Sequence, residues 1–123
     1  MNYKLVLIIG CLMLLVTACS ICCLRHPQIN IEFQNQSSND MDNTSVHFGK
    51  YECRVGVLMR DATAGYGDFT HPITDEAEVR WDSNGVQKME KLSLREAFPK
   101  RKSGTLKFTV TDNGVIVRFI EKP

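Results

Sequence analysis

The residues best suited to acid–base or metal chemistry are three histidines that stand far apart, His26, His47 and His71. His71 is followed by Asp75 and Glu78, a set that would suit proton transfer or a metal ion if the fold gathered it. Such residues are also ordinary on loops and strand surfaces. The chain has no phosphate-binding loop, nucleophile elbow or zinc-protease motif. We therefore predict a protein that is not an enzyme, with no cofactor and no metal site.

A second candidate site is a stretch of basic residues in the C-terminal half. It sets seven cations against Glu90 and Glu96, and such an excess can bind lipid or lipopolysaccharide phosphates, glycans or an acidic protein. The alternative is a solvated surface. Interleaved aromatic residues are missing and the whole chain is nearly neutral, with 15 basic and 14 acidic residues, so nucleic acid is not a predicted partner. The cations are Lys88, Lys91, Arg95, Lys100, Arg101, Lys102 and Lys107.

The cysteines leave two readings open. Cys53 can pair with Cys22 or Cys23 in a disulfide that closes a loop of about 30 residues and adds about 3 kcal/mol of stability. Alternatively, Cys53 is a small buried residue and the other two lie at a membrane surface. If the N-terminus is kept as a membrane span, Cys22 and Cys23 become candidates for palmitoylation.

The N-terminus has the pattern of an export signal. One positive side chain, Lys4, precedes the apolar block Leu5–Val16, which contains no charge and no proline. This block is long enough for a signal peptide but short for a bilayer span, which needs about 20 residues. We expect residues 1–18 to be a signal peptide, and its removal leaves equal numbers of acidic and basic residues.

The next four residues, Val16-Thr17-Ala18-Cys19, resemble the lipobox of bacterial lipoproteins. The resemblance implies cleavage before Cys19 and transfer of a lipid to its thiol. Ser20 follows the cysteine where an aspartate would imply retention in the inner membrane. In a Gram-negative cell the resemblance therefore implies an outer-membrane lipoprotein of the cell envelope that faces the periplasm.

Two other fates of this segment remain open. If nothing is cut, Leu5–Leu24 is long enough for a single span, and Lys4 and Arg25 flank it without choosing an orientation. If an ordinary signal peptidase cuts after Ala18, the product is a free secreted protein. All three fates place the rest of the chain outside the cytosol.

A polar tract separates this segment from the rest of the chain. Gln34–Ser45 reads QNQSSNDMDNTS, which cannot bury enough apolar surface to order itself, so residues 19–45 are predicted to be a lipid-anchored tether. The alternation of Ile29, Ile31 and Phe33 allows one short strand docked on the domain. The folded domain is then expected over residues 46–123.

Period-two alternation predicts a mainly β domain, a small antiparallel sheet or barrel of about five strands. In the first strand, Val57 and Met59 should share the buried face of Cys53. The glycines around Tyr66, in TAGYGD, predict a surface turn. Strands are predicted over 51–59, 77–81 and 105–111. A turn is predicted over 82–85, followed by a return strand or a helix from Val86. A short helix is predicted over 93–98, with Ser93 and Glu96 as its capping box and Pro99 ending it.

The C-terminal hairpin can be given a register. Asn113-Gly114 favours a two-residue turn, which pairs Val110 with Val117 and Phe108 with Phe119. This register places Ile116 and Ile120 on the opposite face, either under a second layer or as an exposed apolar patch.

These observations favour a membrane-anchored, protein-binding module of the cell envelope, in an inhibitory, immunity or complex-supporting role. Tyr51-Glu52-Cys53 resembles the Y-x-C start of small lysozyme-inhibitor lipoproteins, but the second domain cysteine and the inhibitory loop of that family are missing. The alternatives are a single-pass membrane protein, and a binder of anionic lipid or glycan through Lys88–Lys107.

The lipid on Cys19 is directly testable. We expect a palmitate analogue fed to producing cells to label the wild-type chain and not Cys19→Ala, because this thiol is the predicted attachment point. Cys53→Ala, which leaves the lipobox intact, should be labelled like the wild type. In-gel fluorescence of the purified chains measures both, and an unlabelled wild-type chain would leave the uncleaved span as the better reading.

Overall fold

The computed structural model of the protein describes residues 27–98 and 102–123, so Cys19, Cys22, Cys23, Lys100 and Arg101 lie outside the described residues. Eight β-strands make up its regular structure. No helix among the described residues is long and apolar enough to cross a membrane. The strands are β1 (Ile29–Asn35), β2 (Met41–Phe48), β3 (Tyr51–Leu58), β4 (Thr63–Phe69), β5 (Glu76–Ser83), β6 (Val86–Ser93), β7 (Gly104–Thr111) and β8 (Gly114–Glu121).

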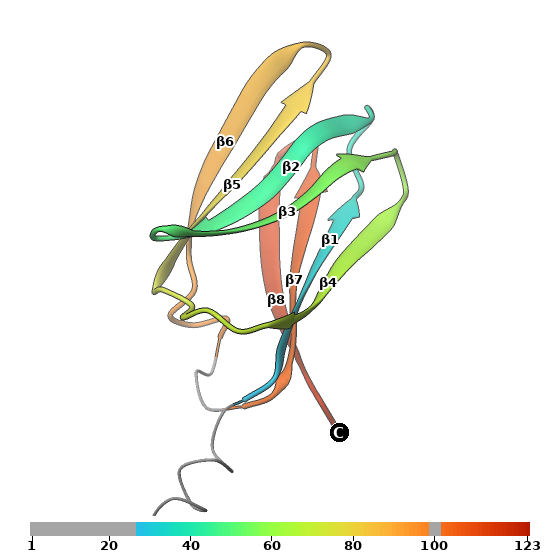
Figure 1. Cartoon of the computed structure of the whole chain (residues 1–123). Coiled ribbons are helices and arrows are strands. Elements are labelled where there is room, and N and C mark those ends of the chain that lie inside the picture. Colours follow the sequence, from blue (N-terminus) through green and yellow to red (C-terminus); the bar gives the residue numbers. More distant parts are fainter. Residues whose placement is uncertain (1–26, 99–101) are drawn as a thin grey trace, which may run out of the picture.

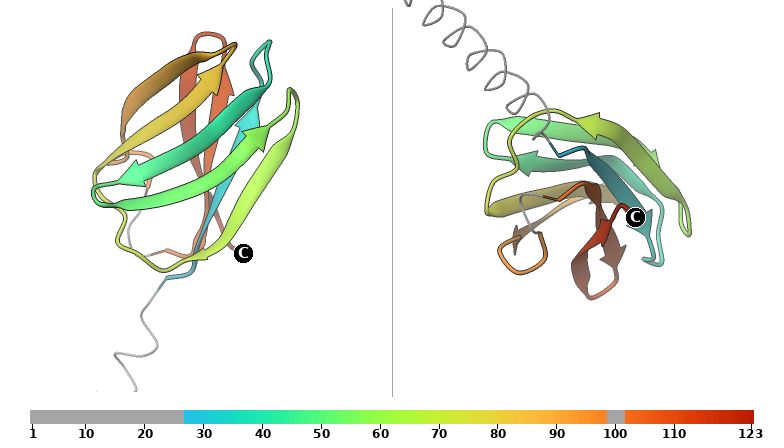
Figure 2. Two further views of the ribbon diagram at one scale, coloured as in Figure 1. Left: turned by 45° about the horizontal axis from the view of Figure 1, so that its top comes forward. Right: turned by 90° about the horizontal axis from the view of Figure 1, so that it is seen from below.

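The strands form two sheets packed face to face. Sheet A has the order β4-β1-β7-β8 and sheet B the order β3-β2-β5-β6. The two layers are visible in Figure 1, with sheet B in front, and from other directions in Figure 2. β1 runs parallel to β7, and every other strand pair is antiparallel. The mainly β prediction is confirmed, but the architecture is a sandwich of eight strands rather than one sheet or barrel of five.

This topology gives the sandwich two different ends. Every odd-numbered strand runs toward one end and every even-numbered strand runs back, so four short connections gather there: 36–40, 59–62, 84–85 and 112–113. We call this the distal end. The opposite, proximal end holds the other connections, the start of β1 and the C-terminus, which Figure 1 marks at the bottom.

The predicted tether is wrong from Ile29 onward. Residues 29–35 form β1, which lies inside sheet A between β4 and β7, and residues 41–45 open β2 inside sheet B. Ile29, Ile31 and Phe33 point inward and are almost fully buried, as their alternation allowed. The domain thus begins at Ile29 rather than Val46, and its polar tract is ordered because its polar groups find hydrogen-bond partners.

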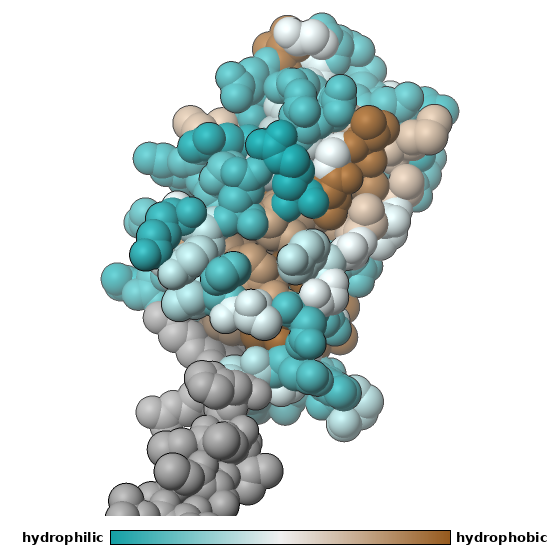
Figure 3. Space-filling model, viewed as in Figure 1, coloured by the Kyte–Doolittle hydropathy of each residue, from teal (hydrophilic) through white to brown (hydrophobic). Residues whose placement is uncertain are grey.

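A double irregularity in sheet B reverses one predicted face. The pairing of β2 with β3 shifts on both sides of Thr44, opposite Gly56, whose φ of 74° suits glycine. Beyond this bulge Leu58 is buried, whereas Val57 is 65% exposed, and Met59, which follows the strand, is 61% exposed. Figure 3 shows apolar side chains on the surface where β3 ends. The prediction that Val57 and Met59 share the buried face of Cys53 is therefore wrong.

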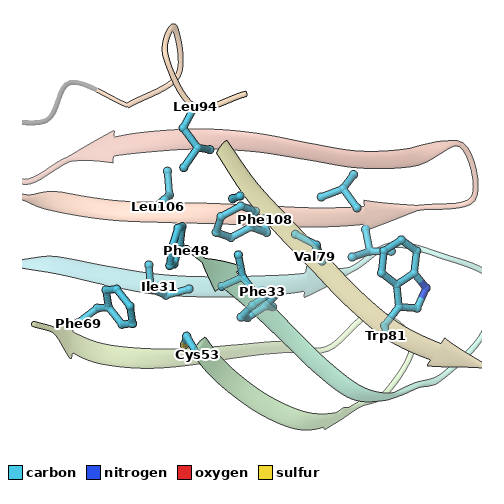
Figure 4. Packing of buried hydrophobic residues seen from close by; sticks show 14 of the residues in the cluster. Ile31, Phe33, Phe48, Cys53, Phe69, Val79, Trp81, Leu94, Leu106 and Phe108 are labelled. Carbon is cyan, nitrogen blue, oxygen red and sulfur yellow. The ribbon is translucent and has the colours of Figure 1, made fainter. Parts of the chain in front are cut away.

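The core lies between the sheets and is built around aromatic rings (Figure 4). Phe33 of β1 stacks on Phe108 of β7 with 5.6 Å between ring centroids. Phe48 of β2 reaches across to Phe108 at 6.3 Å and to Phe69 at 5.3 Å. Each of these side chains buries a large apolar surface, so this cluster ties both sheets together.

The short helix predicted over 93–98 is absent. Ser93 belongs to β6, where it pairs with Glu76, so it cannot act as a helix cap. The chain makes a single turn, closed by a 2.9 Å hydrogen bond from the Phe98 N–H to the Leu94 carbonyl. Both side chains are buried at the proximal end of the core. One turn places them there without a longer helix.

The remaining strand predictions have mixed outcomes. β5 and β7 form where alternation predicted strands and bury their apolar faces. The segment from Val86, predicted as a strand or a helix, is strand β6. The TAGYGD segment, predicted as a turn, is strand β4. In the C-terminal hairpin the turn is Asp112-Asn113, so Val110 pairs with Val115 and the predicted register is wrong by two residues. The faces survive this shift: Ile116 and Ile120 are 56% and 49% exposed.

The place of β1 in the core makes a clear prediction. Phe33→Ala should lower the free energy of unfolding by about 3–5 kcal/mol, because it empties a fully buried ring site. Gln34→Ala, on the outer face of the same strand, should change it by less than about 0.5 kcal/mol. Urea unfolding followed by the fluorescence of Trp81 measures both free energies. Equal effects of the two substitutions would contradict the buried place of β1 and support the tether prediction instead.

Candidate functional site

Two surface cavities of similar size are candidates for a functional site. One, of about 370 Å³, lies at the distal end between the β5–β6 and β7–β8 hairpins and the 36–40 loop. The other, of about 360 Å³, lies over the outer face of sheet B. Their side chains differ in how completely they satisfy one another.

The sheet-B cavity is lined by two acidic and two basic residues whose charges balance, Glu76, Glu78, Arg80 and Lys91, and an ion pair of Glu52 with Arg54 lies on the same outer face of the sheet. The Nε of Arg54 donates to Oε1 of Glu52 at 2.7 Å, and this hydrogen bond holds the pKa of Glu52 below its usual range, with the positive charge adding to it. His47 Nδ1 lies 3.9 Å from the other carboxylate oxygen, and Arg80 donates to Glu78. This is a self-neutralised polar surface, which gives little drive to bind a ligand.

The distal end is organised by one buried amide, Asn35, which ends β1 and is fully buried. Its Nδ2 donates to the carbonyls of Asn39 at 2.8 Å and Leu58 at 3.0 Å. Its Oδ1 accepts from the N–H of Ser37 at 2.9 Å, and its own N–H donates to the Ala62 carbonyl at 3.0 Å. One side chain thus fixes the 36–40 loop and the end of β3, and its backbone adds the 59–62 loop.

Further hydrogen bonds join these loops to the C-terminal hairpin. The N–H of Ser38 donates to Asp112 Oδ1 at 2.8 Å, and its hydroxyl donates to Oδ2. The Ser38 hydroxyl, then its N–H, and the charge of Lys88 hold the pKa of Asp112 below its usual value. Asp40 accepts from the N–H of Arg60 at 2.7 Å. Three of the four distal connections are therefore held together by side chains.

Strand β6 places two charges on the inner side of the sandwich. In the register with β5, Lys88 lies opposite Trp81 and Glu90 lies opposite Val79, and both partners are buried. Glu90 accepts a hydrogen bond from the N–H of Val115 on β8, the edge strand of the other sheet. These charges line the distal cavity instead of a dry core. Inward charges at a sheet edge also hinder edge-to-edge association.

Large apolar side chains are exposed around the distal end. Val57 and Met59 lie where β3 ends, and Val86, at 58% exposed, follows the β5–β6 turn. Single exposed apolar residues are normal on a protein surface, but these accompany the loops that the hydrogen bonds fix in place. The distal end combines rigidity, a cavity and apolar contact points.

The predicted basic stretch does not form one patch among the described residues. Lys88 lines the distal cavity, Lys91 lies on the outer face of sheet B, and Lys107 lies on sheet A. Three of the cations have acidic neighbours, which lowers their local excess of charge. Lys107 lies 3.8 Å from Glu32, Lys102 lies 3.3 Å from Glu121, and Arg95 lies 3.8 Å from Asp75.

The histidine candidate is also dispersed. His71 stacks on Tyr51 with 4.3 Å between ring centroids, while Asp75 lies beside Arg95 and Glu78 beside Arg80. Across 27–98 and 102–123 no three acidic, histidine or cysteine residues are grouped to hold a metal ion. The geometry therefore offers this set no shared substrate position.

Cys53 is a free thiol in the core, 2% exposed on the inner face of β3. Burial raises its pKa to about 11, with the charge of Glu52 adding to the shift, so the thiol stays protonated and unreactive at neutral pH. The structure describes it as the small buried residue of the second reading, and the predicted partners Cys22 and Cys23 lie outside the described residues.

The sequence analysis missed the residues that shape the distal end. Asn35 continues the inward period of Ile29, Ile31 and Phe33, and a polar residue at an inward position was the signal that could have marked it. Trp81 falls within the predicted strand 77–81, but its contact with the cavity depends on the neighbouring β7–β8 hairpin, which no local pattern reveals.

No protein-family model matches the sequence, and no curated protein is similar to it. One solved structure, an NMR structure of a protein from Eubacterium rectale, is similar in fold, with a TM-score of 0.51 at 12% identity. The match covers 76% of this chain and 87% of that chain. At this identity the similarity concerns the fold alone.

The bond between Ser38 and Asp112 can be tested through pH. We expect Ser38→Ala to raise the pKa of Asp112 toward its ordinary value of 3.8, because the hydroxyl bond favours the carboxylate. In the wild type the folded-state pKa lies below the unfolded one. Asp112 therefore stabilises the fold above pH 3.8, and this contribution disappears as the pH falls through the lower folded-state value.

NMR titration of the Asp112 carboxyl carbon measures the shift directly. Gln36→Ala, in the same loop but with an exposed side chain, is the matched control and should leave this pKa unchanged. An unchanged value in Ser38→Ala would mean that the hydroxyl bond does not persist in solution.

Proposed function

We propose that this protein is an exported, membrane-anchored module of the cell envelope whose distal end binds another protein. The observation that carries the proposal is the difference between the two ends of the sandwich. Four connections, a cavity and exposed apolar side chains gather at the end opposite to the one where the N-terminal segment joins β1.

The anchor of this proposal is a lipid on Cys19, with an uncleaved span as its alternative. Only residues 19–28 separate Cys19 from β1, and they reach at most about 35 Å. Strands of eight residues add about 27 Å between the proximal and distal ends. The distal end would then face away from the bilayer, where a partner in the periplasm can reach it.

The chemistry of the distal end favours a partner with a basic and partly apolar face. Asp40, Asp61 and Asp112 lie in its loops, against the single cation Arg60. Carboxylates around apolar contact points give orientation and a fast approach, while burial of Met59 and Val57 supplies affinity. An inhibitor or immunity protein requires such a rigid, preformed surface.

The proposed role is non-enzymatic. The alternative, binding of anionic lipid or glycan through Lys88–Lys107, has less support because its described cations lie on different faces and several have acidic neighbours. The similarity of Tyr51-Glu52-Cys53 to lysozyme-inhibitor lipoproteins agrees with an inhibitory role and adds no binding residue.

Site-specific photo-crosslinking in producing cells tests the proposal. A benzophenone amino acid at Met59, in the full chain, should give one discrete crosslinked species, because this side chain would be buried by the partner. The same amino acid at Thr105, near the proximal end of sheet A, is the control and should give none.

A second variant connects the crosslink to affinity. Val57→Glu keeps an exposed position exposed, so the fold should persist, but it should weaken binding of the captured partner by about tenfold or more. Crosslinks that appear only from Thr105, or an affinity that Val57→Glu leaves unchanged, would reject the distal end as the binding surface.

A further inference from the structure

Two mostly buried residues that line the distal cavity carry a polar group without a hydrogen-bond partner in the protein. Trp81 and Ser83 are 7% and 6% exposed, and both line the cavity. Among the described residues, neither the indole N–H of Trp81 nor the hydroxyl of Ser83 has a hydrogen-bond partner. Both donors are therefore free to bond to water or to a ligand in the cavity.

These two groups open into the cavity. The hydroxyl of Thr44 is the only side-chain polar atom of the described residues that is both fully enclosed and unpartnered. The polar atoms of Trp81 and Ser83 therefore keep contact with solvent, although their side chains are mostly buried. Figure 4 shows Trp81 at the distal end of the core with its indole nitrogen directed away from the other labelled side chains.

The charges of the cavity restrict what it can bind. Lys88 brings one positive charge, and Glu90 and Asp112 bring two negative charges. The local excess is negative, which disfavours an anionic ligand. A cationic group cannot accept the hydrogen bonds that Trp81 and Ser83 offer, and it would meet the ammonium group of Lys88.

Donors and acceptors occur together in the cavity. Trp81, Ser83 and Lys88 offer donors that no protein acceptor uses. Glu90 accepts from Val115 and Asp112 accepts from Ser38, but each carboxylate has further lone pairs to offer. Sugar hydroxyls both donate and accept, so they can satisfy both sets of groups.

From these observations we propose that the distal cavity is a binding site for a neutral saccharide unit. Its volume, about 370 Å³, falls in the range of small-ligand sites. The edge of Trp81, rather than its face, contacts the ligand, because so little of the ring is exposed. The proposal does not depend on a protein partner, since the cavity residues differ from Val57 and Met59.

The chain contains its own reporter for this site, because Trp81 is its only tryptophan. The full chain, in a zwitterionic detergent without a sugar headgroup, is titrated with glucose, galactose, N-acetylglucosamine and the N-acetylglucosamine trimer. We expect a saturable change of Trp81 emission with at least one of them, at a Kd in the millimolar range. Tighter binding of the trimer than of the monomer identifies a glycan chain, and equal binding identifies a free sugar.

Variants separate a built site from a nonspecific response. Ser83→Ala and Lys88→Met each remove one donor and should weaken binding by about 2–10-fold. Lys91→Met, which removes the same charge from the outer face of the same strand, should leave the affinity unchanged. Unfolding curves of all variants control for stability.

Three results would overturn the proposal. One is the lack of a saturable response to any of the four sugars. The second is equal affinity in Ser83→Ala, Lys88→Met and Lys91→Met. The third is a stronger response to inorganic phosphate or to arginine methyl ester than to every neutral sugar, because the cavity would then select charge rather than hydroxyl groups.

Discussion

The structure depends on the insertion of β1 between β4 and β7. All seven residues of β1 pair in parallel with β7, and five of them also pair with β4. Without this strand, sheet A would divide into separate pieces, and Phe108, which contacts Phe48 of sheet B, would lose the ring of Phe33 that stacks on it. The strand ends at Asn35, so the same segment that completes the core also positions the distal loops. One strand therefore contributes both to the core and to the loops beside the candidate site.

The sequence predicted what local alternation encodes. The faces of β5 and β7 follow from residues such as Val79 and Phe108, whose neighbours along the strand are polar. It failed where long-range pairing overrides local composition: the segment of β1 looks like part of a polar tether because its partners, β4 and β7, lie far along the chain. The bulge at Gly56 reversed a face, since one extra residue shifts a period of two. The candidate site was not predicted, because Trp81, Glu90 and Asp112 meet only through the packing of separate hairpins.

The two ends of the sandwich differ in chemistry as well as in connection. The proximal end holds the two longest connections, 70–75 and 94–103, and closes the core with Leu94 and Phe98. The distal end has short connections tied by Asn35, Ser38 and Asp112, which leaves them little freedom to rearrange. A surface that is fixed before binding loses little conformational entropy when a ligand or partner arrives. The proposed protein surface and the proposed saccharide cavity share this advantage and use different side chains.

The direction of β1 also decides how the domain would carry a mechanical load. A pull between an anchor joined to its first residues and a partner held at the distal loops acts along the strand, not across it. The hydrogen bonds from β1 to β7 and β4 would then resist together, in shear, instead of opening one after another as in a zipper. Parallel pairing with β7 places the start of both strands at the loaded end, so the two strands cannot separate without sliding past each other. A tethered domain of this design would hold its partner under tension better than its small size suggests.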